Sequence, residues 1–215
     1  MKFFNQFKAS AKEFKKLRSL VLASLLLAIY VVLAVFVSVQ VTDTLRISTG
    51  FIAQILTGIL FGPVVGTISA ILGDTIQLIV KPTGAWFYGW SLNAALTGLV
   101  YGIAFYGKLP RRGAASGSEK RPGFLVKFLA LDLKFLLRTL IAVTIVHMLI
   151  NALLGTYWCT VVYGKQFMIY FSTRFIKNLV EIPVDTIMTY YLLRALSEVG
   201  DFRRMVADTV RKLEK

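Results

Sequence analysis

Five cations stand apart from the basic clusters of this chain, each near one end of a long apolar segment: Arg46, Lys81, Lys165, Arg174 and Lys177. A cation isolated in apolar surroundings attracts an anion, and the planar guanidinium of an arginine offers two parallel donors to a carboxylate. The types and positions of these residues therefore predict a site for a small anionic molecule.

Aromatic and polar side chains accompany the cations. The aromatic residues offer flat faces either to a ligand ring or to the membrane interface, where Trp and Tyr are common. The polar residues lie within apolar segments, where a carboxylate facing lipid costs about 2.5–3.5 kcal/mol, so we expect them to face a cavity or the bundle interior. Besides the five cations, the predicted ligand-binding set comprises Asp74, Trp86, Tyr88, Asn93, His147, Asn151, Trp158, Asn178 and Glu181. A molecule with an aromatic head and an acidic tail suits all these groups.

Some of these residues also allow a different interpretation. Lys177 precedes Glu181 by four residues, so on a helix the two charges can simply neutralise each other. The only histidine, His147, can form hydrogen bonds within a helical bundle without binding a ligand. A membrane-embedded enzyme using Asp74, His147 and Glu181 is a further alternative, but spacing such as HExxH is absent. A channel is a third alternative, but no residues repeat as a pore-lining ring. For the chain as a whole we expect no metal, no cofactor and no catalysis.

The composition indicates an integral membrane protein. Of 215 residues, 56% are hydrophobic, the mean hydropathy is +0.68 and the net charge is +14. Most basic residues fall in three blocks that flank the apolar segments, Lys2–Arg18, Lys108–Lys127 and Arg194–Lys215. This distribution predicts that the blocks are cytoplasmic and argues against nucleic acid as the partner. The single cysteine excludes an intramolecular disulfide bond.

The uncharged segments predict an all-α membrane protein with six transmembrane helices and both termini in the cytoplasm. The expected spans cover about 19–40, 47–61, 64–80, 91–106, 136–155 and 174–194, with a cytoplasmic linker at 108–123. The second and third spans are joined by a tight turn at Phe61-Gly62-Pro63, because Pro presets a turn. Residues 1–18 and 197–215 are expected to form basic amphipathic cytoplasmic segments. Residues 81–90 and 155–173 are expected to form aromatic outside loops.

Several stretches of the chain, spread over residues 20–196, together resemble one known family. They are LRISTGF, FGPVVG, PTGAWFYG, SLNAALTGLVYG, YGKQF and RFIKNLVEIPVD. Their combination is similar to the folate-family substrate-binding (S) components of energy-coupling factor (ECF) vitamin transporters.

The resemblance implies a multi-pass protein of a bacterial cell membrane that captures folate in an outward-facing cavity. It also implies docking onto a transmembrane coupling subunit driven by two cytoplasmic ATPases, after which the S component topples in the membrane. Such a subunit has no ATPase of its own. Ser24 and Ala28 stand where the family carries an Ala-xxx-Ala docking motif in its first span.

The chain departs from this family at two places that bear on the ligand. Lys81 stands where members usually carry an apolar residue, and Ala34, Val35 and Phe36 stand where many have an arginine. The alternative ligand is therefore another vitamin such as pantothenate, which has a carboxylate but no ring.

Overall fold

The computed structural model describes residues 2–42, 45–47, 49–82, 87–110, 132–164 and 166–214. Its helices are α1 (Lys2–Glu13), α2 (Leu17–Phe36), α3 (Phe51–Val80), α4 (Tyr88–Phe105), α6 (Leu133–Thr144), the π-helix η1 (Ile145–Leu154), α7 (Gly155–Tyr163), α8 (Phe167–Glu198) and α9 (Gly200–Glu214). Strands β1 (Val39–Thr42) and β2 (Leu45–Ile47) form an antiparallel hairpin. The predicted all-α class is thus confirmed in outline, with this hairpin as an addition in the described residues.

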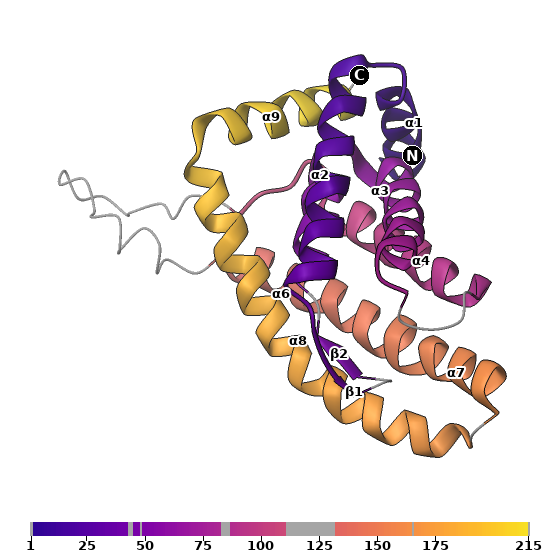
Figure 1. Cartoon of the computed structure of the whole chain (residues 1–215). Coiled ribbons are helices and arrows are strands. Elements are labelled where there is room, and N and C mark those ends of the chain that lie inside the picture. Colours follow the sequence, from indigo (N-terminus) through magenta and orange to yellow (C-terminus); the bar gives the residue numbers. More distant parts are fainter. Residues whose placement is uncertain are drawn as a thin grey trace.

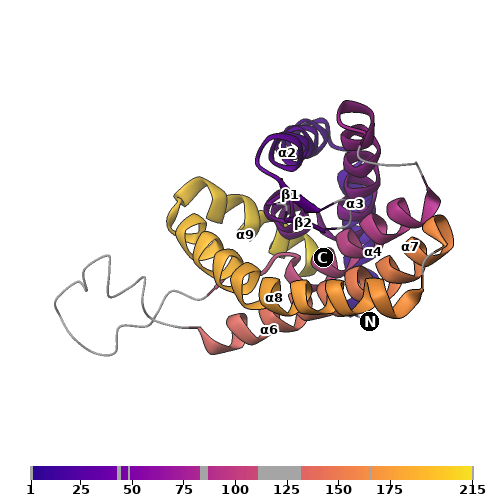
Figure 2. The ribbon, with the colours of Figure 1, turned by 60° about the horizontal axis from the view of Figure 1, so that its bottom comes forward.

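Within the described residues, three helical segments are long and apolar enough to cross a membrane. They are Leu17–Phe36, Phe51–Val80 and Leu133–Tyr163, the last formed by α6, η1 and α7 end to end. Figure 2 shows α8 lying alongside α6, and α2 beside α3. The six-span arrangement itself stays a prediction.

Helix α3 turns back on itself at Gly62. The φ of Gly62 is 83°, in the left-handed region that glycine adopts without steric cost, and Pro63 follows it. The two halves, 51–61 and 63–80, pack against each other: a Cβ on Gly66 would lie 3.9 Å from the Cα of Gly58. In an unbroken helix, residues eight apart are separated by about 12 Å. The turn therefore makes α3 a helical hairpin.

Both terminal helices hold this turn. The Ser10 hydroxyl on α1 donates to the Phe61 carbonyl at 2.6 Å and accepts from the Val64 N–H at 3.0 Å. From the other end of the chain, Thr209 on α9 donates to the Leu60 carbonyl at 3.2 Å. Figure 1 shows both chain ends at this end of the molecule. Helices α1 and α9 therefore belong to the packed fold.

Glycines allow α4 to approach the α3 hairpin closely. A Cβ on Gly98 would collide with the carbonyl of Gly66, and a Cβ on Gly102 would collide with Pro63. This close backbone contact lets α4 present one face to the interior of the bundle. The core combines buried side chains of most helices, including Ile55, Ile59, Phe105, Val146 and Leu193.

The aromatic outside loop predicted at 155–173 is wrong over most of its length. Helix α7 continues η1 as far as Tyr163, and α8 begins at Phe167. Gly164, with a φ of 67°, ends α7 in a left-handed C-cap. Aromatic and β-branched residues have a modest helix propensity, which tertiary packing overrides here. For the same reason Tyr88–Trp90 belongs to the first turn of α4 rather than to a loop.

Candidate functional site

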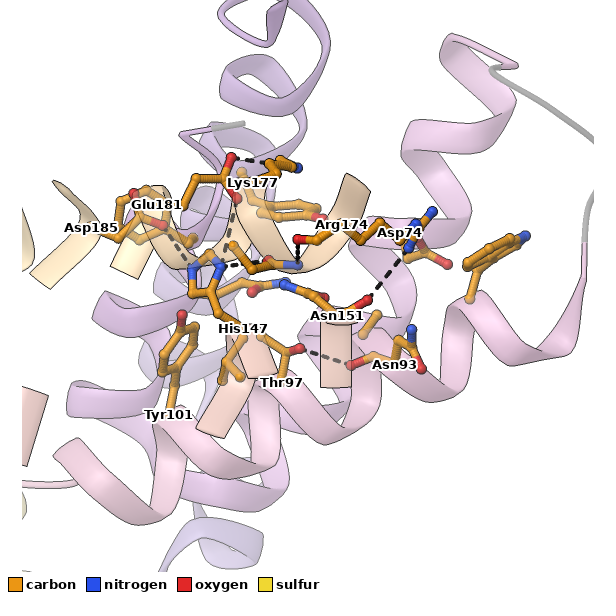
Figure 3. A pocket seen from close by; sticks show the side chains of 17 residues that line it. Asp74, Asn93, Thr97, Tyr101, His147, Asn151, Arg174, Lys177, Glu181 and Asp185 are labelled. Carbon is orange, nitrogen blue, oxygen red and sulfur yellow. Dashed lines mark hydrogen bonds and ion pairs between the residues drawn. The ribbon is translucent and has the colours of Figure 1, made fainter. Parts of the chain in front are cut away.

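A cavity of about 380 Å³ lies among α2, α3, α4, η1 and α8 (Figure 3). Its volume falls in the range of about 300–1,000 Å³ that is usual for small-molecule sites. Its lining residues are Tyr30, Phe51, Gln54, Asp74, Trp90, Asn93, Ala94, Thr97, Tyr101, Val146, His147, Asn151, Arg174, Lys177, Asn178, Glu181 and Asp185.

Helix α8 contributes the charged wall of the cavity. Its lining residues are Arg174, Lys177, Asn178, Glu181 and Asp185, which follow one another at steps of one, three or four residues. Residues at such steps share one face of a helix. A single helix therefore brings two basic and two acidic side chains to the same space.

His147 connects η1 to this wall. Its Nδ1 lies 2.9 Å from Asn178 Oδ1, and its Nε2 lies 3.0 Å from Asp185 Oδ2. Asn178 donates from its Nδ2 to the Arg174 carbonyl at 2.8 Å, so its Oδ1 is the atom that faces the imidazole. Glu181 Oε2 lies 3.6 Å from His147 Nδ1. These contacts show the histidine cross-linking two helices, and no metal-binding cluster occurs among the described residues.

The two cations of the cavity have different surroundings. Lys177 lies 3.4 Å from Glu181, so these charges neutralise each other. Arg174 donates from NH1 to the Asn151 carbonyl at 3.4 Å and from NH2 to the Cys159 sulfur at 3.1 Å, both neutral acceptors. Its Nε is buried and has no hydrogen-bond partner among the described residues. The arrangement leaves the charge of Arg174 available to an anion.

Helix α4 forms the opposite wall. Asn93 accepts from the indole N–H of Trp158 at 3.1 Å and donates to the Ile150 carbonyl at 3.4 Å. Two residues before Asn93, Ser91 donates to Asp74 at 3.2 Å. Asn93 therefore fixes the spacing between α4 and the η1–α7 helix, and its orientation is set by protein contacts.

The cavity unites eight residues of the predicted binding set: Asp74, Asn93, His147, Asn151, Arg174, Lys177, Asn178 and Glu181. Three others do not line it. Lys81 and Tyr88 are exposed, and Trp158 packs against Phe87 with 5.5 Å between ring centroids. Trp86, Lys165 and the side chain of Arg46 lie outside the described residues.

Other lining residues are absent from the predicted set: Tyr30, Phe51, Gln54, Trp90, Ala94, Thr97, Tyr101, Val146 and Asp185. Helical spacing could have found several of them. Trp90, Thr97 and Tyr101 share a face with Asn93, and Asp185 continues the face of α8. Tyr30, by contrast, lies on an apolar helix whose sequence does not single it out.

Residues 18–193 match the family "ECF transporter, substrate-specific component", and the chain belongs to this family. It is therefore a membrane transport subunit, not an enzyme, and its class works with energy-coupling partners. The family predicted from the sequence motifs is confirmed.

The individual relatives carry names that include a ligand, which the family description does not. The chain is 28% identical over 176 residues to the folate transporter FolT of Clostridium novyi, covering 82% of this chain and 88% of the relative. It is 25% identical over 181 residues to FolT of Leuconostoc mesenteroides, covering 82% and 84%. A crystal structure of FolT bound with folic acid superimposes with a TM-score of 0.68 at 28% identity, covering 84% of this chain and 95% of that one.

Proposed function

We propose that this chain is the folate-binding subunit of an ECF importer. The observation that carries the proposal is Arg174, a cavity cation whose described hydrogen bonds go only to neutral groups. An unneutralised guanidinium in a membrane protein is costly unless an anion joins it. A carboxylate of folate supplies that anion. The relatives named FolT, at 28% and 25% identity, point to the same ligand.

The remaining cavity surface suits the ring of the same molecule. Figure 3 places Asp185 and Glu181 on the opposite side of the cavity from Asp74, with Arg174 between them. Carboxylate and amide oxygens accept hydrogen bonds from an amide or amidine edge such as that of a pterin. The Trp90 ring adds an aromatic face. We assign the ring to the cavity walls and the acidic tail to Arg174.

The topology that accompanies this function comprises six spans with both termini in the cytoplasm of a bacterial cell. The positions of both chain ends at one end of the molecule are consistent with this (Figure 1). The partners are a transmembrane coupling subunit and two ATPases, and toppling of the S component then delivers the vitamin. Ser24 and Ala28 are both exposed on α2, as a docking surface requires.

The test is ligand identification on detergent-purified protein, by mass spectrometry and by titration of tryptophan fluorescence with folate and then pantothenate. Saturable quenching by folate supports the proposal. Quenching by pantothenate alone, or by neither compound, overturns it.

An Arg174→Gln variant sharpens the titration. Hydrogen bonds to charged groups contribute about 1.5–3 kcal/mol, which corresponds to about ten- to a hundredfold in affinity. We expect folate to bind to this variant more weakly by that factor. Unchanged affinity would show that Arg174 does not hold the carboxylate.

A further inference from the structure

The guanidinium of Arg174 lies directly over a residue without a side chain. A Cβ placed on Gly155 would be 2.7 Å from Arg174 NH1, a separation that real Cβ atoms do not show. Gly155 is buried where η1 meets α7, and the helix runs through it without a break. Its φ of −62° is helical, so the backbone there does not require glycine. What glycine provides here is space, because an added methyl group would occupy the position next to the guanidinium.

The other neighbours of Gly155 leave room. The same Cβ would lie 3.5 Å from Asn93 Nδ2 and 3.5 Å from the Ile150 carbonyl, both ordinary contact distances. The crowded atom is thus the far end of a flexible side chain, which can move without disturbing the backbone. A methyl group on Gly155 would displace the guanidinium rather than disrupt the helix.

One turn further along α7, Cys159 completes the surroundings of the guanidinium. Its buried sulfur accepts from Arg174 NH2 at 3.1 Å. Residues four apart on a helix lie one above the other, so Gly155 provides space and Cys159 provides an acceptor on the same face. A thiol is a weak, neutral acceptor, so it orients the guanidinium without neutralising its charge.

We propose that Gly155 is a specificity-determining residue: by having no side chain, it lets Arg174 occupy the position from which the guanidinium meets a ligand carboxylate. The specificity part rests on the proposed function. Gly155 touches no part of the ligand in this proposal and acts through the position of Arg174.

The binding test compares two probes on wild-type protein and on Gly155→Ala. Folate carries carboxylates, and 6-methylpterin carries the ring without a carboxylate. We expect Gly155→Ala to weaken folate binding about ten- to a hundredfold, the effect expected for Arg174→Gln, and to leave 6-methylpterin binding unchanged. Gly200→Ala is the matched control, because nothing lies within 4 Å of the added methyl group. Equal effects on both probes, or no effect on either, overturn the proposal.

A second measurement needs no ligand. Gly155→Ala should lower the thermal unfolding temperature when Arg174 is present, because the displaced guanidinium loses its two hydrogen bonds. In an Arg174→Ala background the same change should leave the temperature unchanged or raise it, since Ala favours a helix over Gly. The same shift in both backgrounds shows that the two residues are not coupled and overturns the proposal.

The two measurements separate the possible failures. If wild-type protein binds neither probe, the folate function is refuted, while the thermal cycle still decides whether Gly155 positions Arg174. If wild-type protein binds folate but Gly155→Ala does not change the preference for folate over 6-methylpterin, the function stands and the role of Gly155 is refuted.

Discussion

His147→Ala tests whether one side chain joins the two halves of the cavity wall. The His147 side chain is 7% exposed and connects η1 to two residues of α8 that lie almost two turns apart. The substitution removes one hydrogen bond to the amide of Asn178 and one to the carboxylate of Asp185. It also leaves the buried Asn178 and the partly buried Asp185 facing a newly emptied space.

The size of the effect follows from these two contacts. A hydrogen bond between neutral groups contributes about 0.5–1.5 kcal/mol, and one to a charged group about 1.5–3 kcal/mol. Their sum gives a loss of about 2–4.5 kcal/mol in the free energy of unfolding. For a chain of this size, 1 kcal/mol corresponds to about 2–4 °C, so the unfolding temperature should fall by about 4–18 °C.

The assay is thermal unfolding of detergent-solubilised protein, followed by intrinsic fluorescence. Asn151→Ala is the matched control: it lies one turn along from His147 and lines the same cavity, but Arg174 uses its backbone oxygen, which the substitution keeps. A double-mutant cycle with Asp185→Ala should show coupling of about 0.5–3 kcal/mol. Equal unfolding temperatures for His147→Ala and Asn151→Ala would refute the cross-linking role.

Three further substitutions probe packing, ligand binding and docking. Gly102→Ala should destabilise the protein by about 1–3 kcal/mol, because its methyl group meets the backbone of Pro63, whereas Gly200→Ala should have almost no effect in the same unfolding assay. Lys81→Ala should leave folate affinity unchanged in a fluorescence titration, because Lys81 is exposed and does not line the cavity, and a large loss would place it in the site. Ser24→Leu should spare binding but impair uptake into vesicles containing the complete transporter, and normal uptake would remove Ser24 from the docking surface.

The charged wall of the cavity was predictable because one helix carries it. Within a continuous helix, steps of three and four residues fix which side chains share a face, so Arg174, Asn178 and Glu181 could be grouped from the sequence. The same spacing extends to Asp185. The hairpin turn at Gly62 could also be predicted from the sequence, because Gly and Pro interrupt an apolar run there.

The rest of the cavity depends on how separate helices cross. Tyr30 and Gln54 line it because α2 and the first half of α3 turn those faces inward, and nothing in their local sequence sets that rotation. Lys81 is the opposite case, a residue predicted for the site that does not line the cavity. It continues the spacing of Asp74 along α3, but the helix ends there, with Lys81 at a φ of −138°, and its side chain is exposed. Helical spacing fails as a guide once the helix stops.

The polarity of the site also explains why α8, one of the six predicted spans, is not apolar enough to be counted as a membrane-crossing helix. Helix α8 is 32 residues long, yet it is not among the three apolar candidates in the described part of the chain. Arg174, Lys177, Glu181 and Asp185 lie within it, and each faces the cavity rather than lipid. Exposed positions between them are apolar, including Ile176, Leu179, Val180 and Val184. Such a helix crosses a membrane only if its polar face is covered, so the binding site and membrane insertion depend on the same packing of α8 against η1.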